Sequence, residues 1–306
     1  MNNYKLIAAV GIPLALVVAV GCKATYQTNA YNNYTAVATP ASLENGKNLL
    51  ANSCGGCHYD KKVNKYIGGP MHDAPGIIGK VYAANLTNSK TNGILAHYSD
   101  AQLRYLLKTG IAHDGRYVPY MLRPNLSDAD MNDLIVYLRS NDAPVAAADT
   151  TAGITHYSLI GKIVIHVTSK PLPYKAHVPA IVPNDSVAYG RYLVDNFGCY
   201  HCHSGGLTKL NYMDPEATKD YLGGGEKFKT PDGKNIYASN ITFDKNIGIG
   251  NYSQLQFRKA VKEGQGLSRK LSLPMPQFKD LTDKQVDAIY AYIASFQPKN
   301  HSVEGH

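Results

Sequence analysis

Hydrophobic residues recur with helical spacing in two segments of the chain, and a helix start signal precedes each segment. Both sets fall at positions i, i+3, i+4 and i+7, which predicts one buried helical face in each segment. Their members are Met131, Leu134, Ile135 and Leu138 in the first segment and Val286, Ile289, Tyr290 and Ile293 in the second. Thr282 with Gln285 is a capping box, and Ser127 with Asp130 is a weaker version with a shorter acidic partner.

These two helices belong to a repeat that covers most of the chain. A short helical pattern containing a glycine, Gly46 or Gly190, precedes a C-x-x-C-H motif in each half. Further matches follow in the same order, at 68–70 and 223–225, 82–87 and 237–242, 93–94 and 248–249, and 98–110 and 252–264. We interpret the pattern as a tandem duplication of one domain, because the units of a solenoid are far shorter and need more copies.

The segment between the repeats, 141–184, has a different character. It carries five prolines, at positions 144, 171, 173, 179 and 183, around an alternating stretch from Lys162 to Val167. This predicts an extended linker that wraps one domain onto the other, with one short strand at the alternating stretch. The predicted organisation is a first domain at 41–142, a linker at 143–185, a second domain at 186–298 and a tail at 299–306.

The first residues of the chain indicate an export signal followed by a tether. Residues 6–21 form an apolar run broken only by Pro13. Its 16 residues fall short of the ~20 that a membrane-spanning helix needs, and they suit the h-region of an export signal. The small and apolar residues directly before Cys22 resemble the lipobox of bacterial lipoproteins, so 1–22 is predicted to be a lipoprotein signal with a lipidated Cys22. An uncleaved anchor and ordinary signal cleavage are the alternatives. Residues 23–40 lack helical or strand periodicity and predict a tether.

Five cysteines are too few for a disulfide scaffold in a chain of 306 residues. Four of them form two C-x-x-C pairs, each followed at once by a histidine: Cys54, Cys57 and His58, then Cys199, Cys202 and His203. Two thiols at this spacing reach the two vinyl groups of a haem, and the adjacent histidine ligates the iron. A zinc ribbon would place its pairs ~15 to 20 residues apart, and a disulfide gives no reason for the histidine. Two covalently attached haem c groups are therefore predicted.

The sixth iron ligand must come from elsewhere in each repeat. The candidates are Met71 or Met121 in the first repeat and Met213 or Met275 in the second. We expect Met121 and Met275, because they match across the repeat just before the final helix and lie beside prolines; the alternative is ordinary core packing. A thioether raises the reduction potential relative to a second histidine, so both centres are expected to be electron carriers of fairly high potential. His201 is expected to point away from the iron, toward solvent or an interface.

From Ala41 to Phe296 the chain resembles diheme c-type cytochromes. Its Tyr-x-x-Asn-(Leu/Ile)-Thr, Gly-Ile, Tyr-Ser and Leu-(Ser/Thr)-Asp elements are similar to those of the multi-haem cytochrome subunits of membrane-bound alcohol and gluconate dehydrogenases. The resemblance implies an all-α fold built from two tandem cytochrome c domains. Those subunits usually carry three haem motifs, whereas this chain has two.

The same resemblance implies two local features of each domain. The glycine of the first helix should cross an aromatic residue of the last helix, which would pair Gly46 with Tyr137 and Gly190 with Tyr292. A backbone carbonyl in the turn after the haem motif should accept a hydrogen bond from the proximal histidine. That turn lies near Pro70 in the first repeat and near Gly225 in the second.

Two functions follow from these observations. The first is a membrane-anchored electron carrier with two His/Met haems, whose partner is a dehydrogenase, a quinol-oxidising complex or a terminal oxidase. The alternative is a haem enzyme of the diheme peroxidase or thiosulfate dehydrogenase type. A peroxidase needs an iron with an open distal site, and thiosulfate dehydrogenases use a further cysteine ligand. With four cysteines on haem and Cys22 on lipid, no cysteine is left for that role.

The formal charge of +8 raises the question of nucleic acid. Two haems carry four propionates, which offset part of this charge, and the lysines and arginines form no basic run. We therefore expect a protein redox partner and no nucleic acid. The export signal places the protein in the cell envelope of a bacterium, facing the periplasm. Lys23 after the cysteine favours the outer over the inner membrane, by resemblance to lipoprotein sorting signals.

Overall fold

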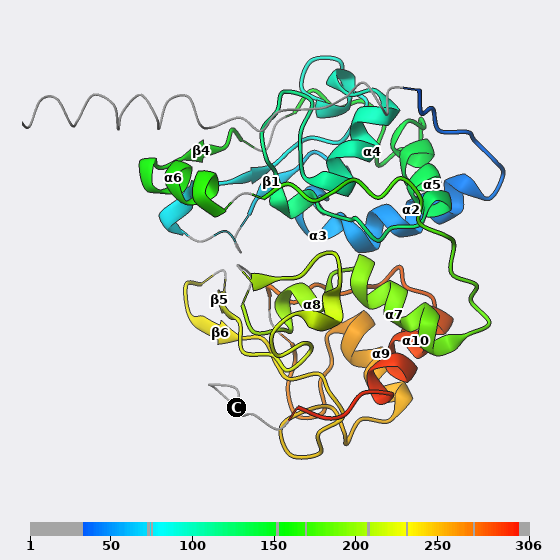
Figure 1. Cartoon of the computed structure of the whole chain (residues 1–306), viewed down its shortest axis with the longest axis vertical. Coiled ribbons are helices and arrows are strands. Elements are labelled where there is room, and N and C mark those ends of the chain that lie inside the picture. The colour runs from blue at the N-terminus through cyan, green and yellow to red at the C-terminus, as the bar shows by residue number, and fades with distance from the viewer. Residues whose placement is uncertain are drawn as a thin grey trace, which may run out of the picture.

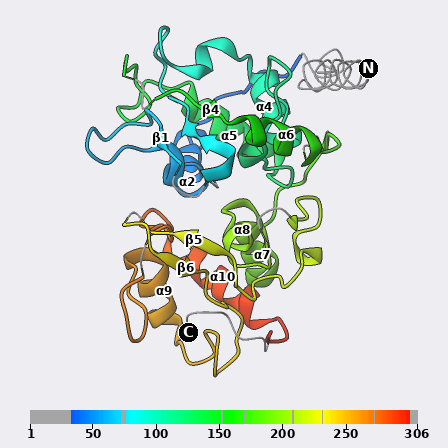
Figure 2. The same ribbon diagram turned by 90° about the vertical axis from the view of Figure 1, so that its left-hand side faces the viewer.

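The computed structural model describes residues 33–299, apart from positions 72, 73, 75, 151, 152, 169, 207, 208, 231 and 272. The described residues form two lobes, one from each half of the chain, with α2 to α6 in one and α7 to α10 in the other (Figures 1 and 2). Cys22 and the expected export signal lie outside the described residues. Within the described ranges, no helix is long and apolar enough to cross a membrane.

The two lobes share four helices in the same order. The helices of the first are α2 (Ser42–Ser53), α3 (Gly55–His58), α4 (Asp100–Thr109), α5 (Asp128–Leu138) and the short turns η1 (Gly76–Ile78), η2 (Ile94–His97) and η3 (Pro119–Met121). Those of the second are α7 (Ser186–Asn196), α8 (Cys199–Cys202), η5 (Pro215–Ala217), α9 (Gln254–Glu263) and α10 (Asp283–Ala294). Helices α2, α3, α4 and α5 thus correspond in order to α7, α8, α9 and α10.

Each lobe is organised by the crossing of its first and last long helices. A Cβ on Gly46 would lie 2.6 Å from Tyr137 Cβ and 2.1 Å from the Asp133 carbonyl oxygen. A Cβ on Gly190 would lie 2.7 Å from Tyr292 Cβ and 1.9 Å from the Ala288 carbonyl oxygen. Only glycine permits backbones to approach this closely. The expected pairing of these glycines with Tyr137 and Tyr292 is confirmed.

Side-chain caps fix where the helices begin. Thr282 and Gln285 form the expected reciprocal capping box on α10, whereas Ser127 accepts a hydrogen bond from the Asp130 amide without a reciprocal bond. The predicted hydrophobic faces of α5 and α10 are buried, except for Tyr290, which is half-buried. The last helices of both lobes therefore form where the hydrophobic pattern predicts them.

The all-α expectation omitted three short antiparallel sheets, each of two strands among the described residues. Their members are β1 (Gly69–Pro70) with β3 (Tyr82–Ala83), β2 (Gly79–Lys80) with β4 (His156–Tyr157), and β5 (Lys227–Lys229) with β6 (Asn235–Tyr237). Gly69 pairs with Ala83, and the Gly225 amide donates to Ala238. In the structure, Gly68 and Gly69 thus correspond to Gly224 and Gly225. This match lies one residue later in the second repeat than the sequence analysis placed it.

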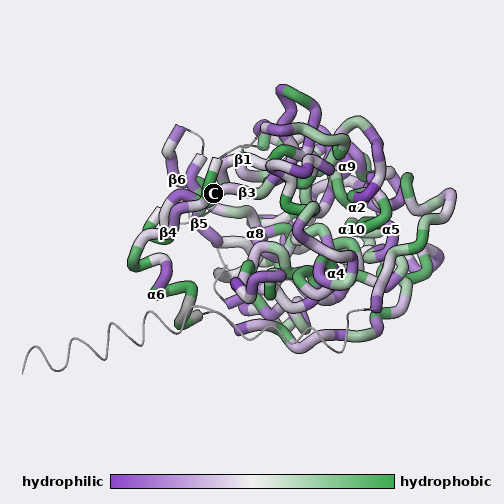
Figure 3. Tube along the Cα trace, turned by 90° about the horizontal axis from the view of Figure 1, so that it is seen from above, coloured by the Kyte–Doolittle hydropathy of each residue, from purple (hydrophilic) through white to green (hydrophobic). Residues whose placement is uncertain are grey.

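The segment expected to be an extended linker holds a helix instead of the expected strand. Residues 162–167 belong to α6 (Leu159–Thr168), which packs on η1 and projects from the first lobe (Figures 1 and 3). Ahead of α6, strand β4 pairs with β2. After α6 the chain is extended: the Leu172 amide donates to the Thr109 carbonyl, and the Val178 carbonyl accepts from the Asp128 amide. Much of 143–185 is therefore attached to the first lobe.

Candidate cofactor sites at the two C-x-x-C-H motifs

The histidine of each motif is held in one tautomer by a backbone carbonyl. His58 Nδ1 lies 2.7 Å from the Ala84 oxygen, and His203 Nδ1 lies 2.7 Å from the Ser239 oxygen. A carbonyl oxygen only accepts hydrogen bonds, so Nδ1 carries the proton in both rings. Nε2 is then left with its lone pair, which is the form that ligates a metal. The expected acceptors near Pro70 and Gly225 are wrong.

A glycine with positive φ lets each of these carbonyls approach the Nδ1 atom of the motif histidine. Gly68 (φ +84°) and Gly224 (φ +79°) donate from their amides to the carbonyls of His58 and His203. A Cβ on Gly68 would lie 2.8 Å from the Ala84 oxygen, and one on Gly224 would lie 2.5 Å from the Ser239 carbonyl carbon. The acceptor therefore lies just after the strand that folds back over the glycine, whereas sequence reasoning placed it on the glycine turn itself.

Matched asparagines hold the acceptor segment in place. Asn85 accepts from the Thr87 amide and donates to the carbonyls of Ala148 and Thr150 at 2.9 and 2.8 Å. Asn240 accepts from the Thr242 amide at 2.8 Å and donates to a carbonyl of the chain after the last helix, at Lys299. Both asparagines thus form a turn with the residue two positions on. The acceptors Ala84 and Ser239 directly precede these asparagines. The repeated Tyr-x-x-Asn pattern was therefore the sequence signal that could have located the acceptors.

Burial shapes the ionisation of the motif residues. The pKa of His58 and that of His203 are both lowered, chiefly because burial disfavours the imidazolium. Burial likewise raises the pKa of the Cys54 thiol and raises that of Cys199 to about 12. Neither cysteine is in a disulfide. Neutral imidazoles beside protonated thiols at the C-x-x-C-H spacing suit covalent attachment of haem.

The expected sixth ligands lie in matching loops. Met121 ends η3 and packs, partly buried, against the hydrophobic core that Cys54 also contacts. Met275 is partly buried in the loop between α9 and α10. Met71 follows β1 directly, and Met213 lies in the loop before η5, with its carbonyl facing Lys175. Met121 and Met275 thus occupy equivalent positions before the last helix, whereas Met71 and Met213 do not.

Arg123 lies beside the first motif, close enough to the second lobe for its charge to act on His201. Its guanidinium donates to the Ser53 carbonyl at 2.9 Å and to the Leu122 carbonyl at 2.6 Å. Within the described part of the chain, its buried Nε has no hydrogen-bond partner. Arg123 also contributes to the lowered pKa of His58, and to that of His201, which burial and this charge bring to about 3. A buried, orphaned donor beside both motifs fits a site that receives an anionic group such as a haem propionate.

The two motifs lie at the junction of the lobes. Ser53, directly before Cys54, donates from its hydroxyl to the Asn196 carbonyl at 3.3 Å. Asn125 donates to the Tyr212 carbonyl at 2.9 Å. Tyr212 also contacts the His201 ring, with centroids 5.3 Å apart. His201 therefore packs against a residue of the lobe junction.

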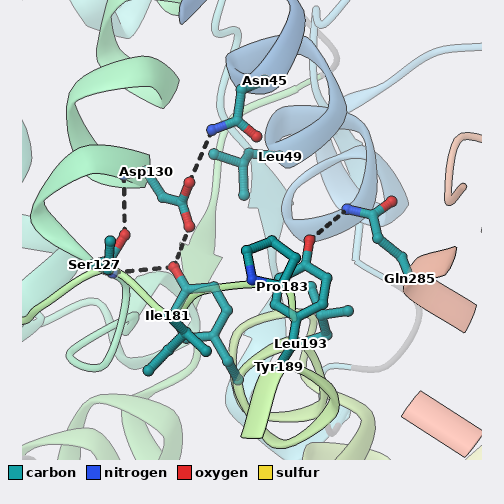
Figure 4. Close-up of a pocket in the computed structure, with 11 residues that line it drawn as sticks. Asn45, Leu49, Ser127, Asp130, Ile181, Pro183, Tyr189, Leu193 and Gln285 are labelled. Carbon is teal, nitrogen blue, oxygen red and sulfur yellow. Dashed lines mark hydrogen bonds between the residues drawn. The ribbon is translucent and has the colours of Figure 1, made fainter. Parts of the chain in front are cut away.

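A pocket at the same junction is separate from the motifs. Asp130 accepts from Asn45 at 2.8 Å and from Tyr192, while Gln285 donates to Tyr189 at 3.4 Å (Figure 4). Burial, with the charge of Asp130 nearby, raises the pKa of the Tyr192 phenol. The pocket lining includes no motif residue and none of the four candidate methionines. The network fixes one lobe against the other.

The described residues contain no group of three or more histidine, cysteine, aspartate or glutamate side chains that could hold a metal ion. Each C-x-x-C-H motif instead offers one imidazole nitrogen and two thiols, and each lobe also has a methionine-bearing loop before its last helix. This donor set matches the covalent and axial bonds of haem c.

Comparison with known proteins gives a family for the first lobe. The cytochrome c family model matches residues 43–142. The gluconate 2-dehydrogenase cytochrome c subunit of Pantoea cypripedii is 28 % identical over 279 residues, covering 87 % of this chain and 62 % of that protein. The fructose dehydrogenase cytochrome subunit of Gluconobacter japonicus is 35 % identical over 146 residues, covering 47 % of this chain and 26 % of that protein.

A third relative covers less. The cytochrome c subunit of the quinone-dependent alcohol dehydrogenase of Gluconobacter oxydans is 36 % identical over 106 residues, or 34 % of this chain and 20 % of that protein. The chain thus spans less than two thirds of the length of each of these relatives. Residues 43–142 match a cytochrome c domain, and the chain is homologous to cytochrome c subunits of dehydrogenases.

Proposed function

We propose that this chain carries two haem c groups in two tandem cytochrome c domains, 41–142 and 186–298, and passes single electrons through them. One observation supports extending the cytochrome c assignment of 43–142 to the second lobe. His203 repeats the hydrogen bond of His58, with the same 2.7 Å length, to a carbonyl that directly precedes a matched asparagine. A chance C-x-x-C-H sequence would have no reason to reproduce that arrangement.

The residues proposed to hold the groups follow from this repeat. Thioether bonds are assigned to Cys54, Cys57, Cys199 and Cys202, and axial ligation to His58, Met121, His203 and Met275. When bound, each haem supplies one reversible single-electron couple. The chain keeps each Nε2 unprotonated through the Nδ1 hydrogen bond and places the Arg123 charge at the junction of the lobes.

The proposed partners are redox proteins. Relatives named as subunits of gluconate, fructose and alcohol dehydrogenases support a dehydrogenase as electron donor. A quinol-oxidising complex and a terminal oxidase are the other proposed redox partners. The proposal includes protein redox partners and does not include nucleic acid.

The proposed location is the bacterial cell envelope, facing the periplasm, with a lipid on Cys22 and the outer membrane preferred. Mass spectrometry of the N-terminal peptide tests the anchor. We expect a peptide that begins at a diacylglyceryl-modified Cys22. An unmodified Cys22, or a peptide that begins elsewhere, would remove the lipoprotein assignment and leave the electron carrier in place.

Redox titration of the isolated haem-loaded protein tests the carrier itself. We expect two one-electron steps and, in both oxidised haems, the long-wavelength charge-transfer band that a methionine ligand gives ferric haem. Catalytic consumption of peroxide or thiosulfate would replace the carrier by a haem enzyme. A single one-electron step would remove the second site.

A further inference from the structure

One side of helix α6 presents aliphatic side chains to solvent. Leu159, Ile160, Ile163 and Val167 are 69, 53, 42 and 71 % exposed. At 3.6 residues per turn, these four positions fall within an arc of about 100° on the helix. Ile77, in the η1 turn on which α6 packs, is 59 % exposed. We call these five residues the α6 face.

The opposite side of α6 is fixed to the first lobe. A Cβ on Gly161 would lie 2.2 Å from the Ile78 carbonyl oxygen, so the helix backbone rests directly on η1. The Ser158 amide donates to the same carbonyl at 2.9 Å, and its hydroxyl donates to the Ile77 carbonyl at 2.6 Å. Rotation of the helix to bury the exposed side chains would break these contacts. The α6 face is therefore held outward by the fold.

The surroundings of the α6 face are cationic. Lys80, Lys162 and Lys170 are all exposed, the first on the strand that pairs with β4 and the others on or just after α6. No acidic residue occurs in the sequence between Asp73 and Asp100, or between Asp149 and Asp185. These two intervals supply η1, β2, β4 and α6. An apolar surface bordered by lysines is complementary to an anionic lipid surface, in which acyl chains lie beneath negative headgroups.

We propose that the α6 face binds the surface of a membrane that contains anionic lipids. Its shape supports a lipid partner, because α6 projects from the lobe (Figures 1 and 3). Its composition does too: protein interfaces concentrate binding energy in Trp, Tyr and Arg, and the α6 face is entirely aliphatic. This contact is independent of a lipid on Cys22. It would set the orientation of the first lobe, and hence of the first motif, relative to the membrane.

Hydrogen–deuterium exchange of the haem-loaded protein tests this proposal, since it reports α6 locally whatever else holds the protein to a membrane. The probes are vesicles of phosphatidylcholine with phosphatidylglycerol and vesicles of phosphatidylcholine alone. We expect the amides of 159–168 to exchange about tenfold more slowly on the anionic vesicles. The amides of α9, 254–263, form the internal control and should be unchanged.

A matched pair of variants sharpens the test. Ile160→Asp should abolish the protection of α6 on anionic vesicles, whereas Leu255→Asp, at a 60 % exposed position on α9, should preserve it. Both should keep the redox titration of the wild type, which separates loss of this surface from failure of the carrier. Vesicle-bound protein with an unprotected α6 would overturn the proposal. Protection of α6 that appears without vesicles as the protein concentration rises would also overturn the proposal. The same holds for protection of α6 that appears only after a dehydrogenase is added.

Discussion

The Ser53 hydroxyl donates a hydrogen bond to the Asn196 carbonyl across the junction of the lobes, over 3.3 Å. Ser53 directly precedes Cys54, and Asn196 lies three residues before Cys199. The backbone carbonyl of the same serine accepts from Arg123. The first residues of the two motifs thus lie on a shared boundary, an arrangement that would suit electron exchange between the two proposed haems.

Replacing Met275 with histidine tests its assignment as an axial ligand. A second imidazole stabilises ferric iron more than a thioether does, so one midpoint potential should fall while the other stays nearly constant. Spectroelectrochemical titration measures both. Met213→Leu is the control and should leave both potentials in place. An unchanged pair of potentials in Met275→His would remove Met275 as a ligand.

The Arg123 charge should raise the potential of at least one haem, since a nearby cation disfavours the ferric state. Arg123→Gln is expected to lower that potential by an amount on the order of tens of millivolts, within the range that local charge gives. Arg123→Lys should recover much of the loss because it restores the charge. If the glutamine and lysine variants behave alike, the guanidinium acts through packing at Ser53 and not through its charge.

Gly68 should tolerate no side chain, because a Cβ would lie 2.1 Å from the Ala83 oxygen at a φ of +84°. Gly68→Ala is expected to cost about 2 kcal/mol or more in unfolding free energy. It should also disturb the proximal histidine, seen in the paramagnetically shifted NMR signals of the first haem. At neighbouring Gly69 the nearest atom would be 3.7 Å away, so Gly69→Ala should cost less than half as much. Equal costs would argue against the role of Gly68.

Lys108 should give the unfolding free energy a distinct pH dependence. Its side chain is fully buried, donates to the Leu126 carbonyl at 2.7 Å and lies 4.0 Å from Asp128. Burial lowers the pKa of its ammonium from 10.5 to about 8. Between these two values the unfolded chain binds more protons than the folded chain, so stability should rise with pH in that window.

Lys108→Met removes this titration. From pH 8 to pH 10 the unfolding free energy of the wild type should increase relative to that of the variant, by at most about 1.4 kcal/mol per pH unit. Denaturant titrations at several pH values measure it. A difference that stays flat across this window would show that Lys108 titrates normally in the folded protein.

Local sequence patterns predicted much of the helical framework. The capping pair Thr282 and Gln285 marks the start of α10, and the spacing of Val286, Ile289 and Ile293 marks its buried face. Such features depend on neighbours within one or two turns, so the sequence carries them directly. The C-x-x-C-H motifs are local in the same way.

Features that depend on distant contacts were missed. The acceptor for His58 is Ala84, 26 residues away, and it reaches the ring only because the chain folds back over Gly68. Strands of two or three residues carry too little alternation to be recognised. The stretch from Lys162 to Val167 alternates like a strand, yet it forms a helix because Gly161 lets the backbone rest on η1.

The number of covalent haems per chain tests the central claim most directly. Intact-protein mass spectrometry, paired with quantitation of haem iron, should give two haem c groups for the wild type. Cys199→Ala combined with Cys202→Ala should give one haem, with the first site retaining its spectrum. A single haem in the wild type, or an unchanged count in the double variant, would contradict the account of two equivalent sites.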